Sequence, residues 1–576
     1  MNQSASPLPL RIGVHVGDVQ QKGTDILGDA VNIASRVEPL AEPGGVCLSA
    51  QVYDQVHHKL PARLESLGPR KLRGVREPVA IYRIMFPWTQ GSVGPDARPL
   101  PRLAVLPFSN ISPDPKDEYF ADGLTEELIT VLSQIKGLRV ISRTSVQQYK
   151  GTTKSVAIIG SELGADSVLE GSVRKAGCQL RIAVQLINTR TDEHRWSQTY
   201  ERTMDNVFAI QAEVAERTAE SLKVELLSSE REALRESPTS NLAAYDLYLQ
   251  GILAMRRISE GAGPYDALHE EVVRCFEAAI KEDGRFSAAY SSLADFLTQT
   301  IGASHSAKEV VPRARDLATK ALELNSSSSE AHMALGNLAM QADLDWERAE
   351  AEFQQAIALN PSNSRARHWY GVLLMLLQRF TEAKRQYVAA IEVDPLWAVA
   401  RAYQVEADER SGDRASATAR CEKAVQMFPQ NLLLRCRLAE LYVLGDRGND
   451  ALRLIDPLQN ASDLDSRDVR AWVLALLGRP EQSRALVRDW EAGRLPGYFG
   501  PMNIAGYYAL WGEKEKALAL LERDTREGDR ALWARYQAFY FDPLREEPRF
   551  VALLRQLQLP TKLPRSLWQP PTVAAG

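Results

Sequence analysis

Two residues one helical turn apart, Asn32 and Arg36, carry groups that could hold a ribose and a phosphate. They lie in the stretch DAVNIASRVE, which predicts a helix that advances by about 100° per residue. The amide of Asn32 can donate and accept, and the guanidinium of Arg36 offers a fixed fork of donors to phosphate oxygens. From the residues alone, the favoured interpretation of Asn32 and Arg36 is a solvated helix face that binds no ligand. Four apolar residues share another stripe that should face a core: Ala30, Ile33, Ala34 and Val37.

Short strands and turns must position this helix. The stretch LRIGVHVGDV predicts a strand that runs into a turn, and Asp29 is expected to be the N-cap of the helix. GGVCLSAQVYDQV predicts a strand and a short helix, and VAIYRIMF predicts a closing strand rich in β-forming residues. We therefore expect an α/β unit at residues 1–87, followed by an irregular Pro- and Gly-rich linker at 88–101.

The same region resembles the C-terminal half of a class III adenylate/guanylate cyclase catalytic domain. The resemblance runs from Arg11 to Phe86, on LRIGVHVGDV, TDILGDAVNIASRVEPLAEPGGVCLSAQVYDQV and LRGVREPVAIYRI. Its most specific part is the spacing of Asp25, Asn32 and Arg36. It implies part of a ferredoxin-like α/β fold and a reaction that converts ATP to cyclic AMP and pyrophosphate.

The resemblance also implies a role for each site residue. Asp25 would read the exocyclic edge of adenine, and Asn32 would orient the ribose. Arg36 would stabilise the pentavalent phosphorane as the 3′ oxygen attacks the α-phosphate. A basic contact to the triphosphate is assigned to Arg73, where the family usually has lysine, and Lys71 is the competing candidate.

Members of this family use Mg²⁺ or Mn²⁺, held by two aspartates that precede the equivalent of Leu10, and an adenine-binding lysine lies in the same part of the domain. Two-metal phosphoryl transfer needs those carboxylates. Asp18 and Asp29 lie in the wrong segments and are better explained as a turn residue and a helix cap. We therefore expect no metal ligands in this chain, and an N-terminal unit with an exposed sheet edge, a thin core and marginal stability alone.

Three accounts of the missing half stay open at this point. The true protein could continue upstream of Met1. The segment could be a degenerate remnant that serves as an interaction platform. It could also act as half a site, because class III sites form at dimer interfaces, with metals from one subunit and the purine, ribose and transition-state contacts from the other. A homodimer or heterodimer through this segment would then be required.

Residues 102–226 predict a second α/β unit with elements in the order βαβαββα. It resembles the TolB-like amino-terminal domain found beside cyclase domains in many alpha-proteobacterial proteins, on RLAVLPFSN, YFADGLTEELITVLSQIKGLRVISRTS and LGADSVLEGSVRKAGCQLRIAVQLINTRTDEHRWSQTYER. That family offers no agreed catalytic residues. Asp122, Glu126 and Glu127 are interpreted as carboxylates that complement a helix dipole rather than as metal ligands. A second linker is expected at 227–240.

Residues 241–556 predict paired helices with a 34-residue period, since Pro361, Pro395 and Pro429 follow at that interval. This register resembles the tetratricopeptide (TPR) repeat. Earlier copies are expected near Asp283 and Asn325, and the later helices are expected to lose the period. An irregular tail is expected at 557–576. Such repeats form an all-α solenoid with a concave face, which implies a protein or peptide partner in that groove. Gly371 sits where two helices approach closely, and small or aromatic residues recur 5, 8 and 12 positions before each proline: Ala356, Phe353, Ala349, Ala390, Tyr387, Ala383, Ala424, Cys421 and Ala417.

Composition limits the remaining function classes. The 576 residues carry a net charge of −5, and no apolar run reaches the roughly 18 residues of a membrane span, so we expect neither nucleic-acid nor membrane binding. The five cysteines are scattered without metal-ligand spacing, which favours the cytoplasm. The chain is therefore predicted to be a multidomain cyclic-nucleotide signalling protein with a TPR scaffold. One alternative is a catalytically incompetent regulator, and a transcription regulator ranks lowest because residues 1–101 show no DNA-recognition helix.

Overall fold

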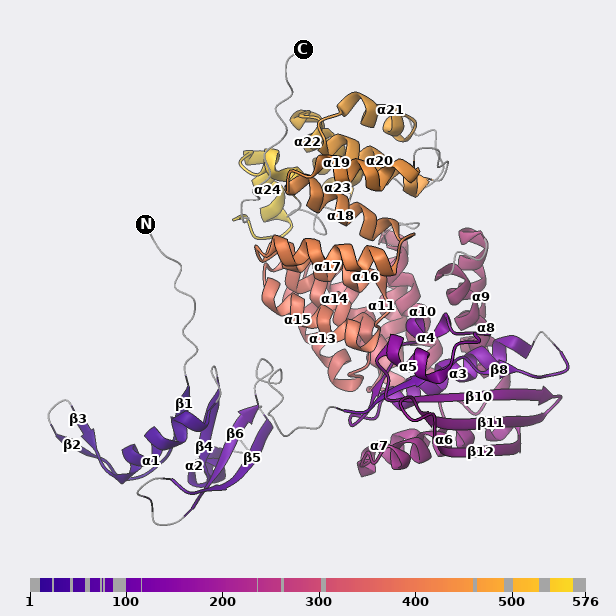
Figure 1. Ribbon diagram of the computed structural model, residues 1–576, viewed down its shortest axis with the longest axis vertical. Coiled ribbons are helices and arrows are strands. Elements are labelled where there is room, and N and C mark those ends of the chain that lie inside the picture. Colours follow the sequence, from indigo (N-terminus) through magenta and orange to yellow (C-terminus); the bar gives the residue numbers. More distant parts are fainter. Residues whose placement is uncertain are drawn as a thin grey trace. The chain divides into compact units, whose positions relative to one another are not determined.

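The chain forms two compact units, Met1–Pro99 and Leu100–Gly576, each of which is described by itself (Figure 1). In the parts of the chain that the structure describes, no helix is long and apolar enough to cross a membrane. The computed structural model describes residues 11–22, 25–41, 45–56, 63–72, 75, 78–85, 100–114, 117–235, 237–259, 264–301, 307–458, 464–491, 501–527 and 539–562.

The first unit contains a four-stranded sheet in the order β1-β4-β6-β5. Strand β1 (Ile12–Val14) runs parallel to β4 (Val46–Ser49), whereas β6 (Val79–Met85) is antiparallel to both β4 and β5 (Arg63–Arg70). A separate hairpin of β2 (Gln20–Lys22) and β3 (Asp25–Leu27) leads into α1 (Asp29–Val37), a 3₁₀ turn (Glu38–Leu40) follows α1, and α2 (Ala50–Val56) follows β4. The core cluster among its described residues is small: Val37, Ala41, Cys47, Leu72 and Ile81.

The cap of α1 differs from the prediction. Gly28, not Asp29, is the N-cap residue, and Asp29 is the first helical residue. Gly28 has a φ of 147°, a backbone conformation that residues with a Cβ rarely adopt. A Cβ at this position would lie 2.9 Å from the Asp18 carbonyl oxygen. The turn from β3 into α1 therefore depends on a glycine, while the Asp29 carboxylate lies in the first turn, where it complements the helix dipole.

The second unit begins with a sheet in the order β12-β11-β10-β7-β9, with the short β8 (Ser109–Asn110) paired to β10. Strands β7 (Arg102–Val105) and β9 (Arg139–Val140) run parallel to one another, and β10 (Ser167–Ala176), β11 (Gln179–Asn188) and β12 (His194–Thr203) form an antiparallel meander. Its helices are α3 (Glu118–Ser133), α4 (Arg143–Gln147), α5 (Val156–Leu163) and α6 (Val207–Ser221).

Four elements in and after this region differ from the prediction. The expected order βαβαββα lacked β8, α4 and β12. Of the ten residues of β12 only Tyr200 is buried, so the strand has no apolar alternation to reveal it. The stretch 227–240, expected as a linker, contains the helix α7 (Ser228–Arg235).

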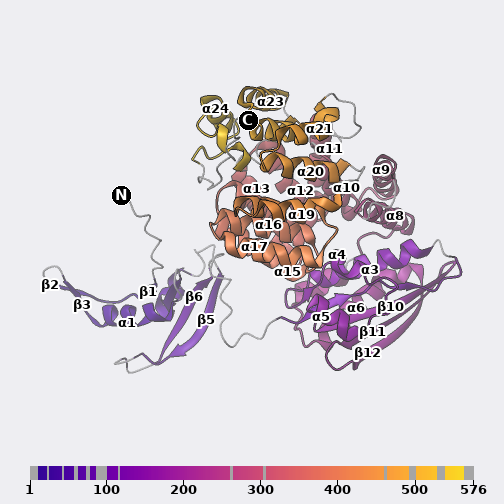
Figure 2. The same ribbon diagram turned by 45° about the horizontal axis from the view of Figure 1, so that its top comes forward.

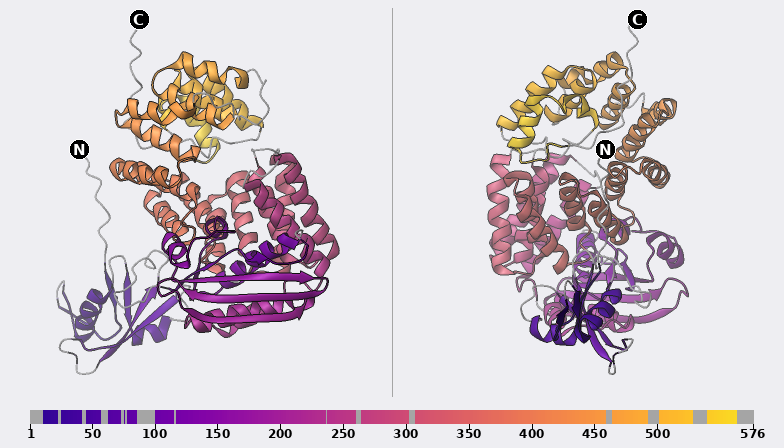
Figure 3. Two further views of the ribbon diagram at one scale, coloured as in Figure 1. Left: turned by 45° about the vertical axis from the view of Figure 1, so that its right-hand side comes forward. Right: turned by 90° about the vertical axis from the view of Figure 1, so that its left-hand side faces the viewer.

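An array of paired helices follows, and Figures 2 and 3 show the pairs stacked one after another. The pairs are α8 (Leu242–Ser259) with α9 (Tyr265–Glu282), α10 (Ser287–Thr300) with α11 (Ala307–Leu324), α12 (Ser329–Leu338) with α13 (Trp346–Leu359), α14 (Ser364–Leu376) with α15 (Phe380–Val393), α16 (Ala398–Arg410) with α17 (Arg414–Met427), α18 (Leu432–Leu444) with α19 (Gly448–Ile455), α20 (Leu464–Leu476) with α21 (Pro480–Glu491), and α22 (Pro501–Leu510) with α23 (Lys514–Glu527). A 3₁₀ segment (Phe539–Leu544) and α24 (Pro548–Gln556) are the last such elements of the described chain.

The predicted repeat register is confirmed by packing. All nine of the small or aromatic positions before Pro361, Pro395 and Pro429 are buried. A Cβ on Gly371 would lie 2.6 Å from the Tyr387 ring, so a glycine is needed where α14 crosses α15. The same contact recurs between Gly336 and Phe353 in an earlier pair.

The turns inside the pairs show that the period extends further than predicted. Left-handed residues occur in these turns at intervals of 34: Leu344, Gln378, Gly412 and Asp446. Gly478 and Gly512 occupy the next two turns, after intervals of 32 and 34. Apart from one shorter interval, the late helices keep the period that the sequence analysis expected them to lose.

The α/β region and the first helical pairs share one hydrophobic core. Asp122 joins them: its carboxylate is 3% exposed and pairs with Arg256 of α8 and, at 2.6 Å, with Lys150. Our interpretation of Asp122 as a helix-end carboxylate is therefore wrong, because it lies in the second turn of α3 and pairs with two cations. A second junction lies in the turn after α15, where the Leu396 N–H donates to Ser145 Oγ at 2.8 Å and Ser145 Oγ donates to Asp394.

Candidate functional site

Helix α1 lies close against β1, which fixes the direction of its side chains. A Cβ on Gly13 would lie 2.2 Å from the Glu38 nitrogen and 2.5 Å from the Ala34 carbonyl oxygen. A Cβ on Gly17 would lie 2.9 Å from the Ala30 Cβ. Two glycines therefore allow the backbone of β1 and the following loop to touch the helix, and this contact sets the rotation of α1 about its axis.

Asn32 and Arg36 lie on α1 away from its buried side. Asn32 is exposed and Arg36 half-buried, whereas Ala30 and Val37 are buried. The Asn32 backbone N–H donates to the Gly28 carbonyl oxygen at 3.2 Å, which is the first helical hydrogen bond. Within the described part of the chain, neither the Asn32 amide nor the Arg36 guanidinium has a side-chain hydrogen bond or ion pair. The two groups thus form the pair, one turn apart, that the sequence predicts.

An ordinary structural role for this pair has to be weighed against ligand binding. Arg36 lies in the last turn of α1 and Asp29 in the first, so both charges complement the helix dipole. That effect amounts to about 0.3–1 kcal/mol per charge. It requires no particular residue at position 32, so the helix dipole alone explains Arg36 but not the exposed amide of Asn32 beside it.

The other predicted site residues are placed unevenly. The backbone of Asp25 opens β3, in register with Lys22, and reaches α1 through Gly28; nothing of its side chain is described. Arg73 lies outside the described residues. Lys71 is exposed directly after β5, next to the buried Leu72. Asp25, Asn32 and Arg36 are therefore parts of one hairpin and helix that are continuous in the chain.

The sequence analysis did not single out a polar pair at the carboxyl ends of the parallel strands β1 and β4. His15 Nδ1 and Ser49 Oγ lie 2.8 Å apart, and Ser49 is fully buried. Burial lowers the pKa of His15, which favours the neutral ring. The available signal was a polar residue at the carboxyl end of each of two strands, at the sheet edge where ligands of open α/β sheets bind. Beyond them, the rings of Tyr53 and Tyr82 stack at 3.8 Å between α2 and β6.

The described residues do not fit a divalent metal site. Asp18 and Asp29 are both exposed. No three His, Cys, Asp or Glu side chains among the described residues lie close enough together to hold an ion. We therefore derive no chemical step through a metal from this chain.

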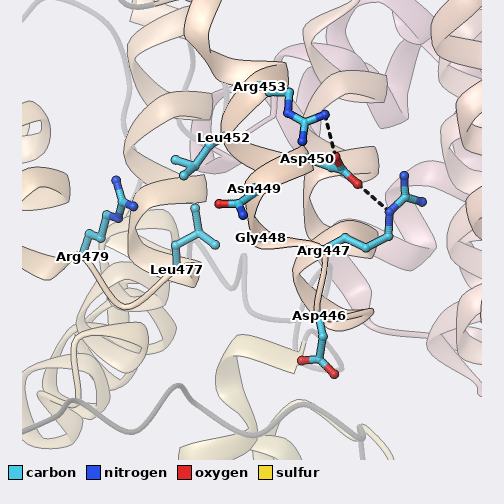
Figure 4. A pocket seen from close by; sticks show the side chains of 9 residues that line it. All are labelled: Asp446, Arg447, Gly448, Asn449, Asp450, Leu452, Arg453, Leu477 and Arg479. Atoms are coloured by element: carbon cyan, nitrogen blue, oxygen red, sulfur yellow. Dashed lines mark hydrogen bonds and ion pairs between the residues drawn. The ribbon is translucent and has the colours of Figure 1, made fainter.

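A hollow of about 490 Å³ lies in the other unit, at the turn between α18 and α19 (Figure 4). The Asp450 carboxylate accepts from Arg447 Nε at 2.7 Å and pairs with Arg453 at 3.2 Å. The Arg447 guanidinium also lies 3.9 Å from the centre of the Tyr442 ring. Two of the three arginines of the hollow thus share the Asp450 carboxylate, and Arg447 also pairs with Glu422 of α17 at 3.1 Å. These contacts give the arginines a role in the helix–helix packing. The hollow is lined by Asp446, Arg447, Gly448, Asn449, Asp450, Leu452, Arg453, Leu477 and Arg479.

Family comparisons agree with the two outer regions of the chain. Residues 1–85 match the adenylate and guanylate cyclase catalytic domain, and residues 410–472 match the tetratricopeptide repeat. The chain therefore carries a segment of the cyclase catalytic-domain family and an array of TPR repeats. Residues 100–217 match the second domain of HilA/YgeH-like transcriptional regulators, so the TolB-like resemblance is not confirmed.

Individual relatives match parts of the chain. The chain is 34% identical over 360 residues to "Putative adenylate cyclase 3" of Rhizobium meliloti, covering 60% of this chain and 59% of that relative's length. It is 32% identical to "TPR repeat-containing protein PA4299" of Pseudomonas aeruginosa, over 32% of this chain and 55% of the relative. A solved structure of an adenylate/guanylate cyclase/hydrolase from Silicibacter pomeroyi is 32% identical to this chain. The match covers 13% of this chain and 46% of the solved chain, with a TM-score of 0.13.

Proposed function

We propose that residues 11–85 are the purine-, ribose- and transition-state-binding half of a site that cyclises ATP to cyclic AMP and pyrophosphate, within a cyclic-nucleotide signalling protein. The observation that carries the proposal is the amide and guanidinium of Asn32 and Arg36, one turn apart on the exposed side of a helix that two glycines hold against β1. The match of this segment to the cyclase catalytic domain supports it.

Each residue of the half-site has a defined task. The Asn32 amide would hold the ribose, while the Arg36 guanidinium would meet the charge that develops on the α-phosphate, where a preorganised cation lowers the barrier most. Asp25 would accept from the adenine amino group, and Arg73 or Lys71 would contact the departing pyrophosphate. Mg²⁺ or Mn²⁺, which members of this family use, would be held by carboxylates of another polypeptide segment, as a homodimeric or heterodimeric arrangement requires.

Complementation between two inactive proteins tests this division of labour. The full chain is mixed with a class III cyclase catalytic domain that keeps its metal carboxylates but has its own Asn and Arg replaced by alanine. Neither protein should form cyclic AMP from ATP and Mn²⁺ alone, and the mixture should. The Arg36→Ala chain should lower the activity of the mixture by at least 100-fold, since one charge-stabilising donor of this kind contributes about 10²–10³ in rate.

A matched control separates chemistry from folding. Gln51 is exposed on α2 of the same unit, so Gln51→Ala should leave the activity of the mixture unchanged. If the mixture stays inactive while the chain still binds a fluorescent ATP analogue in an Asn32-dependent way, the segment is a nucleotide-binding half without turnover. If no nucleotide binds, the proposal is wrong.

A second candidate is a catalytically silent regulator that acts through its TPR array, on which a protein or peptide would bind. The match of residues 100–217 to a domain of transcriptional regulators favours it, because that region then belongs with regulation rather than with catalysis. Sequence-specific DNA binding by the purified chain would extend this candidate to transcription. We propose a cytoplasmic location for either function, supported by five cysteines that form no disulfide with one another.

A further inference from the structure

The last described segment of the chain, residues 539–562, contacts helical pairs that lie far back in the sequence. Trp346 Nε1 donates to the Gln558 carbonyl oxygen at 3.1 Å, across 212 residues. Gln378 Nε2 donates to the Lys562 carbonyl oxygen at 3.0 Å, across 184 residues. Both acceptors are backbone groups beyond the end of α24, so the chain runs along these side chains.

The contacted residues lie at the inner turns of two successive helical pairs. Trp346 opens α13 two residues after the left-handed residue Leu344, and Gln378 is the left-handed residue of the next pair. In the third pair the corresponding turn begins at the end of α16. There Ala407 of α16 belongs to the same hydrophobic cluster as Phe541 and Leu544. The charges of Glu409 and Arg410 also act on Arg545, whose pKa burial lowers. The segment thus reaches the turns of three consecutive pairs.

Apolar packing accompanies these polar contacts. Phe541, Leu544 and Leu557 are fully buried. They belong to the same hydrophobic cluster as Met340 and Leu344 near the α12–α13 turn. The burial of three large apolar side chains favours the docked position of the segment over one in solvent.

The other half of the segment is anchored on the last pair. Arg549 forms an ion pair with Glu522 at 2.7 Å, and Lys514 forms one with Glu547 at 2.9 Å, both involving α23. The segment therefore connects the end of the array with pairs in its middle, which an ordinary terminal cap on the last pair would not do.

We propose that residues 539–562 act as a strap that closes the helical array on itself and occupies the turn edge of the pairs from α12 to α17. In an open repeat array each repeat contacts only its neighbours. The strap adds a contact between distant repeats, so the middle and the end of the array open together. Any partner that uses this edge must first displace a segment tethered at high effective concentration.

Hydrogen–deuterium exchange of the full chain tests the strap against a local cap. Leu557→Asp places a charge in the buried contact, whereas Gln556→Asp places the same charge on its exposed neighbour. The strap predicts that Leu557→Asp raises amide exchange at least 10-fold in residues 340–346 and 374–380 together with α23, and that Gln556→Asp has no effect. Faster exchange confined to α22 and α23, or none at all, would overturn it.

A second measurement does not depend on one disruptive charge. The pair of substitutions Trp346→Phe and Gln378→Met removes both hydrogen bonds to the strap and keeps the apolar surface. It should raise exchange in the same two regions by a smaller factor, about 3-fold. A labelled peptide of residues 539–562 should bind the Leu557→Asp chain at least 10-fold more tightly than the unaltered chain, whose edge is occupied. Equal binding to both chains would contradict the strap.

Discussion

Replacing Glu127 with glutamine should stabilise the second unit above neutral pH. The Glu127 side chain lies on α3, is 7% exposed, and accepts a hydrogen bond from Tyr248 of α8. Burial and the neighbouring charges of Glu126 and Glu330 raise its pKa from 4.5 to about 7, and the Tyr248 hydrogen bond opposes them only in part. Arg143 does not offset this, because it pairs with Glu126.

The magnitude follows from linkage between proton binding and folding. Between pH 4.5 and 7 the folded state holds the Glu127 proton more tightly than the unfolded state, so stability falls as pH rises. One pKa unit corresponds to 1.36 kcal/mol, so the folded state should lose about 3 kcal/mol across that window and nothing further above it. Glutamine has the same shape and no charge to bury. We therefore expect Glu127→Gln to leave stability at pH 4.5 nearly unchanged and to add about 3 kcal/mol at pH 8.

Urea unfolding of the full chain at several pH values, followed by circular dichroism, measures this difference. The matched control is Glu232→Gln, because Glu232 is exposed on α7 and should change the pH dependence by less than about 0.5 kcal/mol. If Glu127→Gln and the unaltered chain keep the same pH dependence, Glu127 is ionised in the folded protein without penalty. The reasoning from its burial would then be refuted.

Two further substitutions test the packing of the second unit by thermal and urea unfolding. Gly371→Ala should lower the free energy of unfolding by about 2 kcal/mol, because the new Cβ would lie 2.6 Å from the Tyr387 ring. The control is Gly284→Ala, where the atom nearest to the new Cβ would be 3.9 Å away, and it should change stability by less than about 0.5 kcal/mol. Asp122→Asn should cost about 3 kcal/mol, because it removes a buried carboxylate that pairs with both Arg256 and Lys150. An effect below about 1 kcal/mol for Asp122→Asn would show that these two ion pairs contribute little to the stability of the folded state.

Features that repeat or alternate along the chain were predictable from the sequence. The 34-residue period predicts which side chains of the array are buried, since each pair repeats the packing of the one before. The 100° advance along α1 likewise predicts that Val37 faces the core and that Asn32 does not. The opposite case is β12, whose single buried residue, Tyr200, leaves nothing periodic to detect.

Carboxylates gave the least reliable predictions, because the same residue type at the start of a helix serves different purposes. Asp122 and Glu127 both follow the first turn of α3, and dipole complementation explained either of them equally well from the sequence. In the structure one pairs with two cations and the other is buried beside further carboxylates. The partner that separates them, Arg256, lies 134 residues away, where no local pattern can indicate it.

The same reasoning applies to the array as a whole. A period of 34 predicts contacts between neighbouring pairs, and from it the array should behave as a chain of nearest-neighbour units. The structure adds contacts between the array and distant parts of the chain, which no period predicts. Asp394, in the turn after α15, accepts from Ser145 of the α/β region, and burial raises its pKa to about 6. Residues 539–562 return to Trp346 and Gln378 from the other end of the chain. Since the middle pairs are held from both sides, a partner of this array would meet a closed body rather than an open groove, and its binding energy must include the cost of releasing one of these contacts.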